Sequence, residues 1–187
     1  MNVILLGPPG SGKTTQAKLL AGRLGGITIA TGDILGDAVK SDTELGRKAR
    51  DYMDRGSMVP DEIILNLVKE QIAIPEAVSG VVLDGFPRTV GQAREVQRML
   101  AAEGERIKAA LLLDVPEEEL VRRRLAKASA EERSDDDAAA IQKRLAAYRS
   151  SNAPLVGHYR ELGVLKFVSG TGTEEQVAEE IKRAIGG

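Results

Sequence analysis

The chain has 187 residues, of which 42% are hydrophobic and 29% are charged, values typical of a globular protein with one domain. It contains no cysteine and a single histidine, which excludes disulfides, a thiol nucleophile, a cysteine-built structural zinc site and a multi-histidine metal centre. With 26 basic and 28 acidic residues, the chain lacks the excess positive charge of nucleic-acid-binding proteins, so we expect no nucleic-acid partner.

No segment approaches the roughly 20 apolar residues that span a membrane, so no membrane partner is expected. The mostly apolar residues 1–6 are too few for a signal peptide and have no basic lead. We therefore expect a buried strand there and a cytoplasmic protein. The predicted elements leave no large apolar stripe for the protein surface, which favours a monomer.

Short apolar runs alternate with longer amphipathic stretches along the chain. Continuously apolar runs are typical of strands covered on both faces, and the predicted strands are residues 3–6, 27–30, 81–83, 109–113 and 164–168. The intervening stretches carry apolar residues at helical spacing, as at Leu19, Leu20 and Leu24. This alternation predicts an α/β fold with a mostly parallel five-stranded sheet and helices on both faces.

Two stretches interrupt the alternation. Residues 30–59 contain two short polar helix candidates, 34–40 and 43–55, and predict a helical flap. Residues 127–136 are charged and poor in large apolar side chains, so a mobile surface loop is expected there, with a new helix from about Asp135. The last helix is expected over 173–185, opened by a capping box.

Residues 7–14, Gly-Pro-Pro-Gly-Ser-Gly-Lys-Thr, match the phosphate-binding motif G-x-x-x-x-G-K-[ST] between the first predicted strand and a helix. Its glycines allow backbone N–H groups to point inward, where they bind phosphate oxygens together with the positive end of the helix. We expect Lys13 to reach the β- and γ-phosphates, and Thr14 or Thr15 to place a hydroxyl on Mg²⁺. The motif predicts a P-loop nucleotide-binding protein, and the absence of an N-K-x-D sequence disfavours a GTPase.

A second motif follows the third predicted strand. Asp84-Gly85-Phe86-Pro87-Arg88 puts a carboxylate where P-loop folds offer one to Mg²⁺ or its water ligands. An arginine run at 122–124 lies among acidic residues, and aromatic residues make up 3% of the chain, so this run is not a base-stacking nucleic-acid site. A solvated helix face with ion pairs accounts for Arg122 and Arg124, whereas Arg123 is open to either interpretation.

These segments together resemble the adenylate kinase family from end to end. The resemblance rests on residues 7–15, 31–33, 84–89, 92, 114–116, 133–136 and 144. It implies reversible, Mg²⁺-dependent transfer of the γ-phosphate of ATP to AMP, which gives two ADP and balances the adenine nucleotides. It also implies a core of residues 1–29, 60–126 and 137–187, an AMP-binding flap of residues 30–59, and the short form of the lid, residues 127–136, without structural zinc.

The resemblance further implies roles for single residues. The implied catalytic residues are Lys13, Arg88, Arg123, Arg133 and Arg144. The implied ATP-binding residues are Gly10, Ser11, Gly12, Lys13, Thr14, Thr15, Arg123, Lys127 and Gly172. The implied AMP-binding residues are Thr31, Gly36, Ser57, Met58, Val59, Gly85, Phe86, Pro87, Arg88, Gln92, Arg133 and Arg144. Mg²⁺ would be held through phosphates and water, with Thr15 and Asp84 nearby.

The sequence departs from the family pattern at several of these positions. Gly36 stands where the family usually has a second arginine for the AMP phosphate, Lys127 replaces an arginine, and Thr14 replaces a glycine. Three alternatives stay open: a kinase for another nucleoside monophosphate, a P-loop kinase for a different small acceptor, and a nucleotide-binding protein with impaired catalysis.

Overall fold

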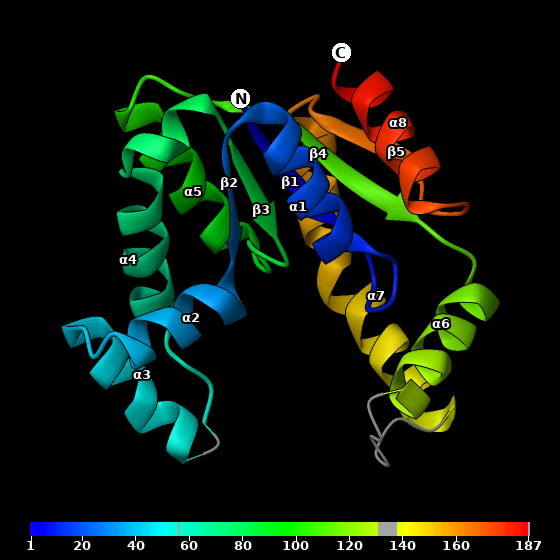
Figure 1. The fold of residues 1–187 in the computed structure, drawn as a ribbon, viewed down its shortest axis with the longest axis horizontal. Coiled ribbons are helices and arrows are strands. Elements are labelled where there is room, and N and C mark those ends of the chain that lie inside the picture. The colour runs from blue at the N-terminus through cyan, green and yellow to red at the C-terminus, as the bar shows by residue number, and fades with distance from the viewer. Residues whose placement is uncertain (56, 131–137, 187) are drawn as a thin grey trace.

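The computed structural model describes residues 1–55, 57–130 and 138–186, and of residues 127–130 it describes the backbone. Its centre is a five-stranded, fully parallel sheet with the strand order β2-β3-β1-β4-β5 (Figure 1). The strands are β1 Asn2–Leu6, β2 Ile27–Ala30, β3 Val81–Asp84, β4 Ile107–Asp114 and β5 Leu165–Ser169. The predicted α/β fold is confirmed, with strand ends shifted by no more than two residues.

Helices connect every pair of consecutive strands. They are α1 Lys13–Leu24, α2 Thr31–Lys40, α3 Glu44–Asp54, α4 Asp61–Ile72, α5 Val90–Ala102, α6 Glu117–Ala130, α7 Ala138–Glu161 and α8 Glu174–Ile185, with a 3₁₀ turn at Pro75–Ser79. The capping box predicted for the last helix is confirmed, because Thr173 and Gln176 bond each other's backbone N–H groups.

The sheet is buried on both faces, which explains its unbroken apolar runs. Val3 and Leu5 of β1 point to one face and pack with side chains from α1 and α8. Ile4 and Leu6 point to the other face and pack with side chains from α4, α5 and α7. The two clusters fix β1 in the middle of the sheet, and the phosphate-binding motif leaves from its carboxyl end.

Two helical arms extend beyond the carboxyl ends of the strands (Figure 1). One arm consists of α2 and α3, which lie between β2 and α4 in sequence, and the other consists of α6 and the first part of α7. In open parallel sheets, ligands bind at the carboxyl ends of the strands near the point where strand order reverses. The residues predicted for the site lie at this edge or on these arms.

Two boundaries differ from the sequence prediction. Residues 127–130 continue α6 rather than starting a surface loop, because the alanines at 126, 128 and 130 are strong helix formers despite their small apolar area. The rest of the predicted loop, residues 131–136, lies outside the described residues. The helix start predicted near Asp135 lies outside them as well. The helix predicted from Ile34 begins at Thr31, directly after β2. In the described part of the chain, no helix is both long and apolar enough to cross a membrane.

Candidate active site

The phosphate-binding loop occupies residues 7–12, between the end of β1 and the start of α1. Gly12 is the N-cap of α1 and has a φ of 90°, a left-handed conformation that favours glycine. No side chain caps this helix end, so its first N–H groups stay available for an anion. Ser11 is buried, and its hydroxyl has no hydrogen-bond partner among the described residues. The loop thus has the backbone form and the unused donors that a phosphate site requires.

Lys13 lies at the centre of the site. Its Nζ donates a hydrogen bond of 3.0 Å to the carbonyl oxygen of Pro8. Burial lowers the pKa of Lys13 from 10.5 to about 8, although the nearby Asp84 carboxylate opposes this shift and Arg88 adds to it. The ammonium is therefore weakly solvated, and its electrostatic attraction to an anionic ligand would be strong.

This pKa predicts how nucleotide affinity depends on pH. Lys13 of the free protein loses its proton above about pH 8, and bound phosphate would hold that proton on. We expect ADP affinity to be level near pH 7.5 and to fall by up to about tenfold per pH unit above pH 8. Calorimetric titrations from pH 7 to pH 10 measure this fall. Arginine stays charged over this whole pH range, so the ADP affinity of Lys13→Arg should not fall. An identical fall in that variant would contradict the assignment of the pH dependence to Lys13.

Asp84 is the last residue of β3 and is 7% exposed. One of its carboxylate oxygens, Oδ2, accepts a 2.6 Å hydrogen bond from the hydroxyl of Thr14 at the start of α1. A carboxylate and a hydroxyl are hard oxygen donors of the kind that Mg²⁺ prefers. Among the described residues no group of three or more acidic or histidine side chains could hold a metal, and Mg²⁺ commonly takes its remaining ligands from phosphates and water. The donor set fits this ion.

Arg88 and Lys13 both line a cavity of about 440 Å³, together with Gly85, Pro87 and Tyr148. Arg88 is held at the rim by a 2.9 Å bond from its Nε to the Gly85 carbonyl. Lys13 and Arg88 therefore place two cations around one space, which suits a phosphate in transfer.

Two residues of the predicted AMP site have structural partners. Gln92 is 6% exposed; its Oε1 accepts from the backbone N–H of Arg88 at 2.7 Å, and its Nε2 donates to Asp61 at 2.7 Å. It supports the Arg88 segment from α5. Phe86 is 1% exposed and belongs to the core, so its predicted contact with AMP stays a prediction.

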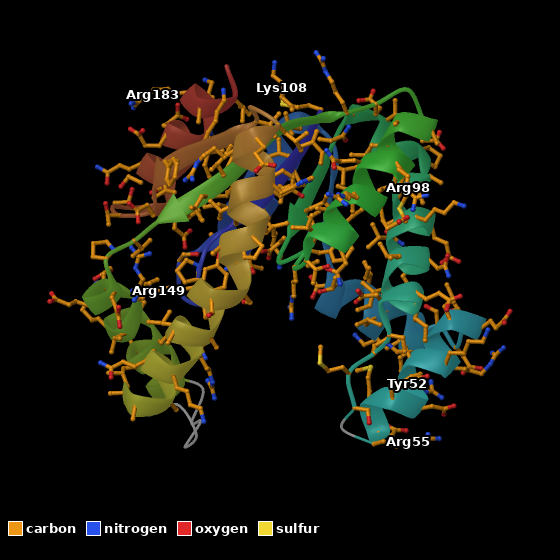
Figure 2. The ribbon with its side chains drawn as sticks, turned by 180° about the vertical axis from the view of Figure 1, so that it is seen from behind. Tyr52, Arg55, Arg98, Lys108, Arg149 and Arg183 are labelled. Atoms are coloured by element: carbon orange, nitrogen blue, oxygen red, sulfur yellow. The ribbon has the colours of Figure 1, made fainter. Side chains whose placement is uncertain are left out.

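Five further residues predicted for AMP belong to the α2–α3 arm or to the turn that follows it: Thr31, Gly36, Ser57, Met58 and Val59. Thr31 is buried at the start of α2, and an added Cβ at Gly36 would meet no atom within 4 Å. Ser57 is exposed, and Met58 is 90% exposed. Tyr52 and Arg55, labelled in Figure 2, mark the end of α3 beside this turn. An apolar side chain so exposed is suited to covering a ligand.

A second cavity, of about 340 Å³, is lined by other residues of the phosphate-binding loop. Its lining includes Gly10, Ser11, Gly12, Thr15, Gln16, Arg123, Gly170, Gly172 and Thr173. The Arg123 guanidinium donates to the Gly170 carbonyl at 3.1 Å and to Glu119 at 2.7 Å. The predicted ATP-binding residues of the P-loop, α6 and the β5–α8 segment thus meet in one place.

Three predicted residues are not assembled in this way. Arg144 is an exposed residue of α7. Lys127 lies in α6, but its side chain lies outside the described residues, as does all of Arg133. Their predicted contacts with phosphates stay predictions.

The comparisons with known proteins agree with this geometry. The family model for adenylate kinase matches residues 5–164. An adenylate kinase of Thermus thermophilus is 48% identical over 184 residues, which cover 98% of this chain and 96% of the relative. That of Thermobifida fusca is 44% identical over 185 residues, or 99% and 98% of the two chains. This chain belongs to the adenylate kinase family. A longer alignment, 211 residues at 37% identity, joins it to the adenylate kinase of Methanothrix thermoacetophila.

Sequence reasoning missed several groups in this adenylate kinase family site. Asp61 supports Gln92 from α4, and the Pro8 carbonyl holds Lys13. Glu119 bonds both Arg122 and Arg123. The spacing of Glu119 from these arginines, three and four residues along one helix, was a readable signal. The other two contacts join residues through the fold or through a backbone atom, and no residue pattern marks them.

Proposed function

We propose that the protein is an adenylate kinase that transfers the γ-phosphate of ATP reversibly to AMP, which gives two ADP and balances the adenine nucleotides. Family membership over the whole chain supports this proposal. The observation that carries it is that the phosphate-binding loop helps to line two cavities, with Lys13 and Arg88 in the first and Arg123 in the second. Two nucleotides bound there would meet with their phosphates at Lys13.

The chemistry needs few protein groups. The AMP phosphate is mostly dianionic at pH 7, because its second pKa is about 6, so its attacking oxygen is already ionised and needs no general base. The chain must hold the two phosphates in line and neutralise their charge. Lys13 and Arg88 would supply this charge, with Arg123, Arg133 and Arg144 as the further cations that the family resemblance implies.

We propose Mg²⁺ as the metal that accompanies ATP. Asp84 would hold it, directly or through water, with Thr14 and Thr15 nearby. When bound, Mg²⁺ neutralises phosphate charge and orients the phosphate oxygens. In the described structure Thr14 donates to the Asp84 carboxylate and so fixes the direction of the oxygen that would face the metal.

We propose that residues 30–59 act as an AMP-binding flap and residues 127–136 as a short lid, because water competes with AMP as the acceptor and must be excluded. We also propose a monomer that works in the cytoplasm. The exposed large apolar side chains of the described residues support the monomer, since they are distributed over the N-terminus, α1, α3 and the turn after it, the 3₁₀ turn, α6, the residue after α7, and β5. Size-exclusion chromatography tests this point.

The function is tested by assaying ADP formation from MgATP with each of AMP, GMP, CMP and UMP as acceptor. We expect AMP to be preferred by at least about tenfold in kcat/KM. Preference for another monophosphate would replace the proposed acceptor. ADP formation that is independent of every acceptor would contradict the kinase proposal, and no ADP formation with any acceptor would favour the nucleotide-binding protein with impaired catalysis.

A further inference from the structure

Glu119 lies on α6 within reach of two arginines. Its Oε2 accepts from Arg122 Nε at 2.7 Å, and its Oε1 accepts from Arg122 Nη2 at 2.8 Å and from Arg123 Nε at 2.7 Å. The Glu119 side chain is 24% exposed, that of Arg123 is 26% exposed, and that of Arg122 is 74% exposed. The contact with Arg123 is therefore the more enclosed of the two.

Arg123 is held at both ends. Its Nε is bound by Glu119 of α6, and its Nη2 donates to the carbonyl of Gly170 in the segment between β5 and α8. Contacts from two different nitrogens of a planar guanidinium, to partners on two different segments, fix the orientation of its plane. The plane is thus set within the cavity of about 340 Å³ that Glu119, Arg123 and Gly172 help to line.

A carboxylate in this place is unexpected on charge alone. The cavity adjoins the phosphate-binding loop, and a negative side chain there repels a polyphosphate ligand. An arginine that served only by its charge would bind phosphate better without Glu119 beside it. The carboxylate makes sense if the orientation of Arg123 matters more than its net charge.

We propose that Glu119 is a positioning residue for the donor nucleotide: it holds the Arg123 guanidinium in the orientation that meets the nucleotide in this cavity. This inference rests on the proposed function, because it takes the cavity to be the ATP side of the site. Glu119 needs no contact with the nucleotide and acts through Arg123.

The first test is Glu119→Gln, which keeps the size of the side chain and removes its charge. We expect MgATP affinity, measured by calorimetry without AMP, to fall by about ten- to a hundredfold, as for loss of one charge-assisted hydrogen bond. AMP affinity should change by less than about twofold. The direction of the change in MgATP affinity is decisive. Without a positioning role, removing a carboxylate near a polyphosphate would strengthen binding or leave it unchanged.

Glu117→Gln is the matched control. Glu117 begins the same helix and forms an ion pair with Arg149 of α7. Arg149 lies beside α6 (Figure 2), and neither residue of this pair lines the cavity. This variant also removes one carboxylate charge and one ion pair from α6, and it should keep the MgATP affinity of the wild type. An equal loss in both variants would overturn the inference, because the effect would then come from α6 as a whole.

A double-mutant cycle separates the inference from the proposed function. Arg123→Ala should weaken MgATP, and adding Glu119→Gln to it should cause no further loss, because Glu119 acts through Arg123. If Arg123→Ala weakens MgATP and Glu119→Gln does not, the positioning role is wrong and the donor site stands. If neither variant changes MgATP affinity, the assignment of this cavity to the donor is wrong, and the inference fails with it.

Discussion

Lys13→Met is expected to lower phosphoryl transfer by at least about a thousandfold, as for loss of a main charge-stabilising group. Lys13 lines the cavity shared with Arg88, and methionine keeps most of its length without the charge. The fold should persist, because the loop conformation depends on glycines such as Gly12, and burial already disfavours the charged lysine. The measurements are the rate of ADP formation and the thermal midpoint.

Lys18→Met is the control for this variant, since Lys18 is an exposed lysine of the same helix. It should retain the wild-type rate. Activity of Lys13→Met within about tenfold of wild type would contradict the P-loop assignment. A large fall in its thermal midpoint would mean that the lower rate comes from unfolding and not from the lost charge.

Gly36→Arg is expected to tighten AMP binding by about ten- to a hundredfold, the effect of one charge-assisted hydrogen bond. Gly36 lies within α2, and its missing side chain would extend into open space, so an arginine fits the backbone. The apo protein should also gain up to about 1 kcal/mol of unfolding free energy, because glycine is a poor helix former. ATP affinity should change much less.

Gly22→Arg separates these two effects. Gly22 is an exposed glycine inside α1 with no atom within 4 Å of an added Cβ, so the variant gains the same charge and helix propensity away from the flap. It should become more stable without a change in AMP affinity. If Gly36→Arg also gains only stability, then a neighbouring cation such as Lys40 already binds the phosphate, or the acceptor is not AMP. Titration with GMP, CMP and UMP separates those explanations.

Local patterns predicted the parts of the site that follow directly from strands. The glycine-rich loop after β1 and Asp84 at the end of β3 were both readable, because parallel strands bring their carboxyl ends to one edge. The length of α6 could not be predicted in this way. Its alanines favour a helix, but they carry too little apolar area to give a periodic hydrophobic pattern.

Side-chain contacts across the fold were beyond sequence reasoning for a different reason. The bonds from Thr14 to Asp84 and from Gln92 to Asp61 join residues that are 70 and 31 positions apart. Their pairing depends on strand order and helix orientation, which no local pattern specifies. Glu119 was local to Arg123, but spacing alone did not distinguish a solvated ion pair from one that orients an arginine in a cavity.

The most direct test of the central claim follows the γ-phosphate itself. The protein is mixed with AMP and with ATP labelled at the γ-phosphate, and the label is traced by separating the nucleotides. A kinase acting on AMP predicts that the label appears in the β-phosphate of ADP, with two ADP formed for each AMP consumed. Label that appears only in inorganic phosphate, with AMP unchanged, would contradict it.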